Sequence, residues 1–305
     1  MYKRLELHNH TTESDAVFTC RELIDFLVND HVDAFALTDH NTISGHRKIK
    51  EILEQEDLPI SGIYGMEYTT YYGHILCLNL TEYVPWENIN LHKPELLFRA
   101  VKEKGALAGI AHPYSFGWAF AQGCRFVMDM TDYSCCDFIE IFNNLEPLHE
   151  VNEKGLLLWE KLVLQGEKLA ATCGMDLHGN SSLHGHYSTY IEGEKNQDVA
   201  KELDTAIRSG RTWVCNGPLL ETETKDGMLT FSINHMEKPG YTPLPDTDYV
   251  ITLKTSQETI TCTVNDQIPL SRFQKDARIV IPKLFKNEPI IENLVCVSPV
   301  IRLEY

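Results

Sequence analysis

Histidine and carboxylate side chains recur along this chain at the places where short apolar runs end. The first of them form His8-Asn9-His10, directly after the apolar run that begins the chain. Alternate residues of a strand point to the same face, so one such pair is also compatible with ordinary packing. The pattern repeats, however, at Asp15, Asp39-His40, Glu67, His74, His112 and Asp176-Leu177-His178. A series of this kind predicts a polynuclear metal site built from strand ends.

The first two thirds of the chain alternate short apolar runs with amphipathic segments, which predicts βα units around a parallel sheet. We expect strands over 4–8, 34–37, 60–70, 74–80, 106–111, 138–142 and 169–173. We expect helices over 20–29, 45–55, 94–104, 156–164 and 199–209. An α/β barrel gathers the carboxyl ends of its strands on one face, where active sites are built. The histidines and carboxylates should therefore converge at the mouth of such a barrel.

The character of the sequence changes after Gly217-Pro218. Residues 219–305 are rich in threonine, valine, isoleucine and turn residues, and 249–255 and 259–264 alternate in the manner of strands. We therefore expect two domains: an α/β domain over 1–218 and a small all-β domain over 219–305.

Composition restricts the partners of the chain. The 305 residues carry a formal net charge of −17, which disfavours a nucleic-acid polymer because phosphate backbones need a basic surface. A small anionic substrate stays compatible, since bound divalent ions can dominate the field of a cleft.

No apolar run approaches the roughly 20 residues that span a bilayer, and the N-terminus has no apolar signal region. With nine cysteines in such a chain, we expect a cytoplasmic protein with reduced thiols and no membrane partner. The sequence does not indicate an oligomeric state.

The ligand types indicate the class of metal. Imidazole and carboxylate together suit Zn²⁺, Mn²⁺ or Fe²⁺. Two such ions about 3.5–4 Å apart can activate a water molecule for hydrolysis, and Glu67 is a candidate bridge between them. Two members of the series have simpler interpretations as well. Asp39 could cap the following turn through its side chain, and His74 could be a packed strand histidine.

The ordered motifs resemble those of the polymerase and histidinol phosphatase (PHP) superfamily. The matching segments are Leu7-His8-Asn9-His10-Thr11, Ser14-Asp15, Leu37-Thr38-Asp39-His40-Asn41, Gly65-Met66-Glu67, Gly73-His74, Ala111-His112-Pro113 and Gly174-Met175-Asp176-Leu177-His178. The resemblance extends over roughly residues 3–217. The stretch from Gly210 to Pro218 and the β-rich tail are more narrowly similar to a stand-alone branch that includes carbaryl-hydrolase-like proteins.

This resemblance implies a distorted (β/α)7 barrel that holds two or three divalent ions of zinc, manganese or iron. By similarity, the ligands of the first ion are His8, His10, Glu67 and Asp176. Glu67 would bridge to a second ion held by His74 and His112, and a third ion would take Asp15, His40 and His178. Asp39 would lie behind the ligands and orient a neighbouring ligand or a turn.

The function implied is that of a metal-dependent hydrolase. The leading hypothesis is a phosphoesterase that cleaves a small phosphorylated metabolite or nucleotide by attack of a metal-bridging hydroxide. The same site could instead hydrolyse a carbon ester, amide or carbamate, and a third alternative is a metal-stabilised binding module. Substrate contacts stay open, and the candidates are Asn143-Asn144, Arg125, His184, His186, Tyr114, Phe116, Trp118 and Phe120.

Overall fold

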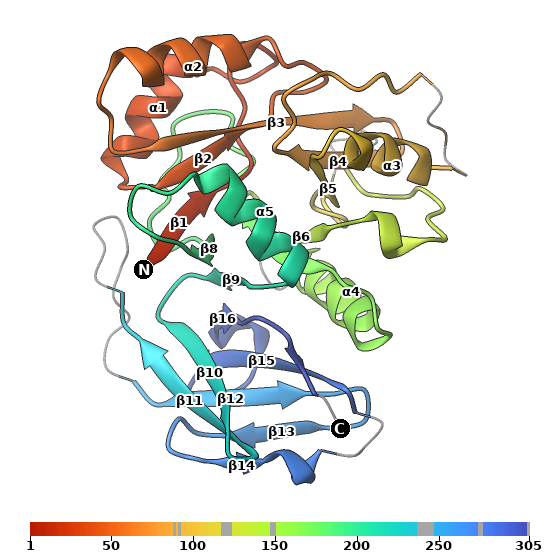
Figure 1. Ribbon diagram of the computed structural model, residues 1–305, viewed down its shortest axis with the longest axis vertical. Coiled ribbons are helices and arrows are strands. Elements are labelled where there is room, and N and C mark those ends of the chain that lie inside the picture. Colours follow the sequence, from red (N-terminus) through yellow and green to blue (C-terminus); the bar gives the residue numbers. More distant parts are fainter. Residues whose placement is uncertain are drawn as a thin grey trace.

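The computed structural model describes residues 1–87, 90, 93–116, 124–146, 151–236, 247–273 and 277–303. An upper α/β part stands on a lower lobe of strands (Figure 1). The upper part contains β1 (Tyr2–Glu6), α1 (Cys20–Asn29), β2 (Ala34–Leu37), α2 (Gly45–Gln55), β3 (Ser61–Thr70), β4 (Gly73–Leu78), α3 (Glu95–Glu103), β5 (Leu107–Ile110), η1 (Tyr133–Cys135), β6 (Phe138–Asn143), α4 (Glu153–Leu164), β7 (Ala170–Gly174), β8 (Ser188–Glu192), α5 (Val199–Ser209) and β9 (Thr212–Cys215). The lobe contains β10 (Leu219–Lys225), β11 (Met228–Asn234), β12 (Tyr249–Lys254), β13 (Thr259–Cys262), β14 (Ile268–Pro269), η3 (Leu270–Arg272), β15 (Ile279–Lys286), η4 (Ile291–Asn293), β16 (Leu294–Val297) and β17 (Ile301–Arg302).

The helices follow local signals in the sequence. At the start of α1, the Thr19 side chain and the Glu22 side chain cap each other's backbone N–H groups in a capping box. Helix α5 begins behind the Asp198 side chain and ends at Gly210, whose φ of 69° is a conformation that glycine adopts without strain. Helices α1, α2 and α5 begin and end at the predicted residues. No helix within the described ranges is long and apolar enough to cross a membrane.

The upper strands form a mixed sheet that is rich in parallel pairs. Strands β1, β2 and β3 are parallel neighbours, and so are β5, β6 and β7. Strand β4 runs antiparallel between β3 and β5. The first residues of β4 therefore lie at the same edge as the carboxyl ends of its neighbours. Strand β8, which the sequence did not indicate, pairs antiparallel with both β1 and β9.

The predicted barrel is not closed by backbone hydrogen bonds. The sheet path ends at β7, and no backbone ladder joins β7 to β8 or β9 among the described residues. Threonine side chains bridge this seam instead. The Thr189 hydroxyl accepts from the Cys173 N–H at 2.9 Å and donates to the Cys173 carbonyl at 3.0 Å, and the Thr212 hydroxyl donates to the Ala171 carbonyl at 2.7 Å. The strands thus curve toward closure but leave an open seam.

The sheet continues across the predicted domain boundary at residue 218. Strand β9 pairs antiparallel with β16, and the path leads on through β15 and β12 to β13. Strands β10, β11 and β14 form a separate three-stranded sheet. Apolar residues from both sides of the boundary share one cluster, which includes Trp213, Leu219 and Val295. The lobe is therefore continuous with the upper part, and its independence as an all-β domain stays a prediction.

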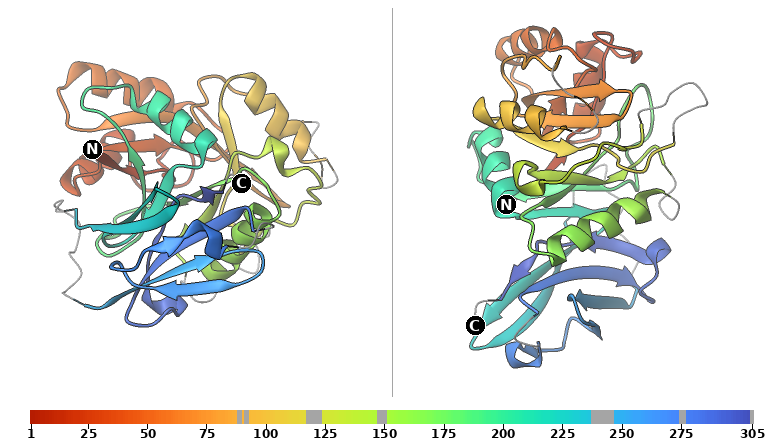
Figure 2. Two further views of the ribbon diagram at one scale, coloured as in Figure 1. Left: turned by 60° about the horizontal axis from the view of Figure 1, so that its bottom comes forward. Right: turned by 90° about the vertical axis from the view of Figure 1, so that its right-hand side faces the viewer.

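Helix α4 lies along the junction between the upper part and the lobe (Figures 1 and 2). Its Glu160 side chain is buried and forms ion pairs with Lys254 of β12 and Lys283 of β15. A buried carboxylate needs a counter-charge, so removing both lysines would be costly. These contacts fix the lobe against the upper part.

Candidate metal centre

The predicted ligand residues converge at one edge of the upper sheet. His8 and His10 follow β1, Asp15 lies in the loop before α1, His40 follows β2, Glu67 lies in β3, His74 is the second residue of β4, His112 follows β5, and Asp176 and His178 follow β7. These positions are the carboxyl ends of the parallel strands, together with the start of the antiparallel β4. The convergence explains why the residues recur at strand ends in the sequence.

The His8-Asn9-His10 segment lies beyond β1, because that strand ends at Glu6 and not at His8 as predicted. Asn9 holds the segment in place. Its buried side chain donates to the Glu6 carbonyl at 3.1 Å and to the Ala36 carbonyl at 2.9 Å. On the other side, the His10 N–H donates to the Leu177 carbonyl at 3.0 Å. These hydrogen bonds hold the backbone of the segment in place, and with it the positions from which the His8 and His10 side chains extend.

The first group of ligand atoms comes from His8, His10, Glu67 and Asp176, and all of them lie within 4.8 Å of one another. The His10 Nε2 atom is 3.0 Å from Asp176 Oδ1. The His8 Nε2 atom is 3.4 Å from both Glu67 Oε1 and Asp176 Oδ1. The group coincides with the predicted ligand set of the first ion.

The second group consists of Glu67, His74 and His112. Glu67 Oε1 is 2.9 Å from His74 Nδ1 and 3.0 Å from His112 Nε2. Glu67 is completely buried and belongs to the first group as well. Its carboxylate therefore has the position that a bridging ligand needs.

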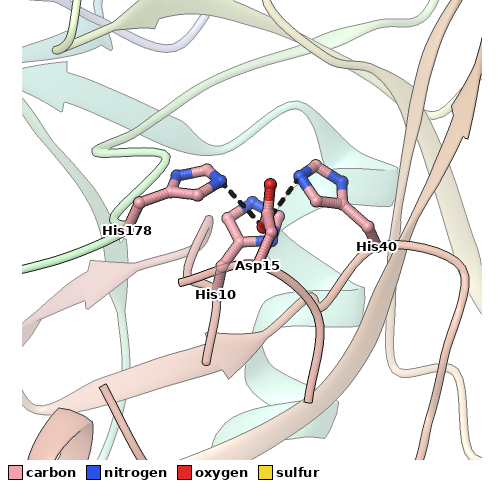
Figure 3. A group of neighbouring side chains, drawn as sticks. All are labelled: His10, Asp15, His40 and His178. Atoms are coloured by element: carbon pink, nitrogen blue, oxygen red, sulfur yellow. Dashed lines mark ion pairs between the residues drawn. The ribbon is translucent and has the colours of Figure 1, made fainter. Parts of the chain in front are cut away.

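The third group lies nearer the surface and is formed by His10, Asp15, His40 and His178 (Figure 3). Asp15 Oδ1 is 3.2 Å from His178 Nε2 and 3.5 Å from His40 Nε2. The prediction contained Asp15, His40 and His178, and the geometry adds His10 to them. His10 is thus shared between the first and third groups, as Glu67 is shared between the first and second.

Several ligand atoms in these groups are buried without a hydrogen-bond partner. They are His8 Nε2, both ring nitrogens of His10, Glu67 Oε2 and Asp176 Oδ1. His10 Nε2 and Asp176 Oδ1 are only 3.0 Å apart, but the pair lacks the geometry of a hydrogen bond. Leaving a buried polar atom unsatisfied costs about 1–3 kcal/mol, so such a concentration needs an explanation. Nitrogen and carboxylate oxygen atoms that converge in this way fit a divalent ion of the Zn²⁺, Mn²⁺ or Fe²⁺ type.

The electrostatics of the site keep its two central carboxylates in the ionised form that metal binding requires, whereas, against the effect of burial, neighbouring carboxylates raise the pKa of His8, His40 and His112. Burial alone would raise the pKa of Glu67, but the neighbouring His74 and His8 hold that pKa well below its ordinary value. Burial would also raise the pKa of Asp176, which His8 and His10 hold well below its usual range. The pKa of His10 is lowered, chiefly by burial. Ionised carboxylates beside a neutral imidazole are the forms that ligate metals.

Two of the ligands have an unusual backbone conformation. The φ angle is 23° at His112 and 52° at Asp176, in the region that favours glycine. Strain of this kind costs on the order of 1–3 kcal/mol per residue and clusters at functional sites. His112 also precedes Pro113, which restricts its backbone further. The fold therefore gives up part of its folding free energy to keep the side chains of His112 and Asp176 in these orientations.

Glu140 of β6 is a member of the centre that the sequence reasoning missed. It is buried, its Oε1 atom is 2.9 Å from His8 Nδ1, and its Oε2 atom accepts from the His112 N–H at 2.9 Å. A signal was present, because Glu140 is the one charged residue in the buried strand Phe138–Asn143. Since both oxygens are engaged, we infer that Glu140 orients His8 and His112.

Replacing Glu140 by glutamine should weaken metal binding without removing a ligand. The amide cannot accept through both of its terminal atoms, so the ring of His8 or the backbone of His112 loses its partner. We expect metal affinity to fall about 10–100-fold, as measured by competition with a chromogenic chelator. Glu95→Gln makes the same change at another buried glutamate and should leave the affinity unchanged. Equal affinities in the wild type and Glu140→Gln would contradict the orienting role.

Asp39 belongs to none of the ligand groups. Its carboxylate accepts from the Thr11 N–H at 2.7 Å, from the Thr11 hydroxyl at 2.8 Å and from the Ser14 hydroxyl at 2.8 Å. These bonds anchor the loop that carries Asp15. We therefore propose that Asp39 positions the third group through its loop.

Asp39→Ala should accordingly affect one metal more than the others. The loop of Asp15 loses three hydrogen bonds to a charged acceptor, whereas the first two groups keep all their ligands. We expect the purified variant to lose the most exposed ion first, which elemental analysis during stepwise dialysis would detect. Loss of every ion at the same chelator concentration as in Glu67→Gln would contradict this selectivity.

The candidate substrate contacts separate into two sets. Asn143 lines the cavity above the centre and donates to Asp176 Oδ2 at 3.0 Å, whereas Asn144 donates to the Gly174 and Tyr187 carbonyls. Phe116 lines the cavity, and the exposed Arg125 lies over its ring. The described lining does not include Tyr114, His184 or His186. Trp118 and Phe120 lie outside the described residues.

Comparison with solved structures supports the fold assignment. A two-domain protein from Bacteroides vulgatus, described as containing a predicted PHP-like metal-dependent phosphoesterase, superimposes with a TM-score of 0.57. The superposition covers 99% of this chain and 95% of that one at 15% sequence identity. The fold is therefore PHP-like, as the motifs predicted. The narrower likeness to the carbaryl-hydrolase-like branch is not confirmed.

Curated relatives match parts of the chain, whereas no family model matches it. An uncharacterised protein from Methanocaldococcus jannaschii is 28% identical over 151 residues, which are 46% of this chain and 81% of the relative. A 5'-3' exoribonuclease from Haemophilus influenzae is 32% identical over 131 residues, 40% of this chain and 47% of the relative. A PolC-type DNA polymerase III from Ureaplasma parvum is 25% identical over 189 residues, 58% of this chain and 13% of the relative. The chain spans less than half of the exoribonuclease and a small part of the polymerase.

Proposed function

From the PHP-like fold and the shared ligand groups, we propose that this chain is a metal-dependent phosphoric ester hydrolase. Its substrate would be a small phosphorylated metabolite or nucleotide. The observation that carries the proposal is that Glu67 belongs to both the first and second groups of ligand atoms and His10 to both the first and third. A structural metal site needs one closed shell, whereas overlapping groups at the base of an open cavity suit hydrolysis.

Three overlapping sets of residues would hold two or three ions. His8, His10, Glu67 and Asp176 would hold the first, Glu67 with His74 and His112 the second, and His10, Asp15, His40 and His178 the third. When bound, zinc, manganese or iron supplies a nucleophile at neutral pH and neutralises charge on phosphoryl oxygens. Glu140 and Asn143 would keep the ligand side chains in position through their hydrogen bonds.

In the part of the chain that the structure describes, the ligand side chains are exposed to solvent on one side of the centre only, so the substrate would approach from that side. The His8 and Glu67 side chains are completely buried, whereas the side chains of His178 and Asp15 are 34% and 60% exposed. A cavity of about 1060 Å³ lies over the exposed side. The substrate would therefore meet the third group first, and its phosphoryl group would reach toward Glu67 from there.

The relatives favour phosphorus over carbon as the centre attacked. Exoribonucleases cleave phosphodiesters, and the matched exoribonuclease supports this chemistry for the corresponding part of the present chain. The chain's net charge of −17 still favours a small substrate over a polymer. An experiment must therefore test separately whether the ester is a phosphate or a carbon ester, and whether the substrate is a small molecule or a polymer.

The test compares four substrates with protein whose metal content is known. They are p-nitrophenyl phosphate, bis-p-nitrophenyl phosphate, a naphthyl carbamate and a 5'-phosphorylated oligoribonucleotide. We expect turnover of a phosphate ester, dependent on added Mn²⁺ or Zn²⁺ and abolished by a chelator. Carbamate hydrolysis without phosphate ester hydrolysis would overturn the proposal. Degradation of the oligoribonucleotide as the preferred substrate would contradict the small-substrate prediction alone.

A further inference from the structure

The cavity above the metal centre has walls that the ligands do not form. Ser14, Thr69, Ser115, Phe116, Leu145 and Glu146 line it together with the ligand side chains. Its volume of about 1060 Å³ exceeds what a phosphoryl group needs and can enclose a drug-sized molecule. With a phosphoryl group at the metal centre, these walls would face the alcohol part of a phosphoester.

These walls offer little positive charge. No lysine or arginine is among the described residues that line the cavity. The wall carries Glu146 as an additional carboxylate, and the exposed Arg125 has its guanidinium carbon 5.8 Å from the centroid of the Phe116 ring. A second anionic group placed beside Glu146 in the cavity would therefore be repelled by that carboxylate.

Phe116 and Leu145 form an apolar lip on the cavity. Each residue is 54% exposed, so its apolar surface is accessible to a ligand in the cavity. They come from different loops, one after β5 and one after β6. The Phe116 N–H donates to Glu146 Oε1 at 3.3 Å, so the two loops are tied together at the lip. An apolar group placed there would cover surface that is otherwise exposed to water.

We propose that the cavity takes phosphoesters whose alcohol part is uncharged and aromatic or apolar. Phe116 and Leu145 contact that part of the substrate, and Glu146 discriminates against a second anionic group beside it. The inference rests on the proposed phosphoesterase function, because it assumes that the phosphoryl group lies at the metal centre.

Binding of non-hydrolysable phosphonates to the metal-loaded protein tests the lip. Titration calorimetry would compare phenylphosphonate with methylphosphonate, which share the charged group and differ in the apolar part. We expect phenylphosphonate to bind about tenfold more tightly, since half-covering two large apolar side chains is enough for that ratio. Phe116→Ala should reduce the ratio to about threefold by weakening only phenylphosphonate, because the Leu145 contact remains. Leu157→Ala, at an exposed leucine of α4 outside the cavity, should keep the wild-type ratio.

The role of Glu146 is tested with 4-carboxyphenylphosphonate. Glutamine can still accept the hydrogen bond from Phe116, so Glu146→Gln removes the charge and keeps the tie between the loops. This probe carries a carboxylate in addition to its phosphonate, and we expect Glu146→Gln to bind it several-fold better, relative to phenylphosphonate, than the wild type does. An unchanged ratio, or equal wild-type affinities for phenylphosphonate and methylphosphonate, would overturn the inference alone. Failure of metal-loaded protein to bind any phosphonate would overturn the proposed function and this inference with it.

Discussion

Replacing Glu67 by glutamine should remove nearly all turnover and most of the bound metal. Glu67 belongs to the first and second ligand groups, is fully buried, and lies within 3.0 Å of both His74 and His112. The amide has nearly the same volume but loses the negative charge. A metal ion contributes several kcal/mol to transition-state stabilisation, so we expect turnover to fall at least about 10²–10³-fold. Assays with a phosphate ester and elemental analysis of the same preparation would measure both effects.

The control for this experiment is Glu95→Gln. Glu95 is also a buried glutamate, but its carboxylate accepts hydrogen bonds from Thr131 and Asp132, away from the centre. That variant should retain its metal and turnover, even where it unfolds at a lower temperature. A Glu67→Gln protein that keeps wild-type metal content and turnover would show that Glu67 is not a ligand of the working site.

The sequence predicted secondary structure best where the local signal and the tertiary environment agree. Helices α1 and α5 have capping side chains and one apolar face, and both have the predicted bounds. Strand β8 was missed because Ser188–Glu192 is a short segment after a loop rich in glycine, serine and histidine. Its pairing with β1 and β9 connects residues far apart in the chain, which no local pattern reveals.

The open seam beside β7 was beyond prediction for a similar reason. Closure depends on the register and tilt of every strand, and these are global properties of a barrel. Here the hydroxyl groups of Thr189 and Thr212 bridge the gap. In the sequence, neither threonine differs from an ordinary strand threonine.

The candidate site was predictable as a set of residues but only partly as an arrangement. The strand-end pattern contained the side chains that the structure brings together. That His10 joins the third group depends on how the loops of Asp15 and His178 fold over it. Glu140 was not predicted because it lies in the middle of a buried strand, whereas the predicted ligands follow the ends of strands. A charged residue inside such a strand is itself a functional signal.

Metal removal should lower the melting temperature of the wild-type protein by about 10 °C for each ion that is lost. At a metal concentration a thousand times the dissociation constant, binding stabilises the folded state by about 4 kcal/mol per site. A change of 1 kcal/mol shifts the melting temperature of a chain of this size by roughly 2–4 °C. Melting curves in chelator and in excess Mn²⁺ or Zn²⁺ would measure the difference. Identical curves would contradict every proposal that relies on bound metal.

His10→Ala should show a smaller rise in melting temperature on addition of metal than the wild type does. This loss comes in addition to any destabilisation of the metal-free protein by the substitution. His10 is shared by the first and third groups, so its loss weakens two sites together. His46→Ala provides the matched control, because His46 Nε2 is hydrogen-bonded to the Gly65 carbonyl at 2.7 Å and belongs to no ligand group among the described residues. Both variants should melt earlier in chelator, but only His46→Ala should regain the full increase when metal is added. Comparing the shifts, and not the melting temperatures, separates ligation from packing because each variant serves as its own metal-free reference.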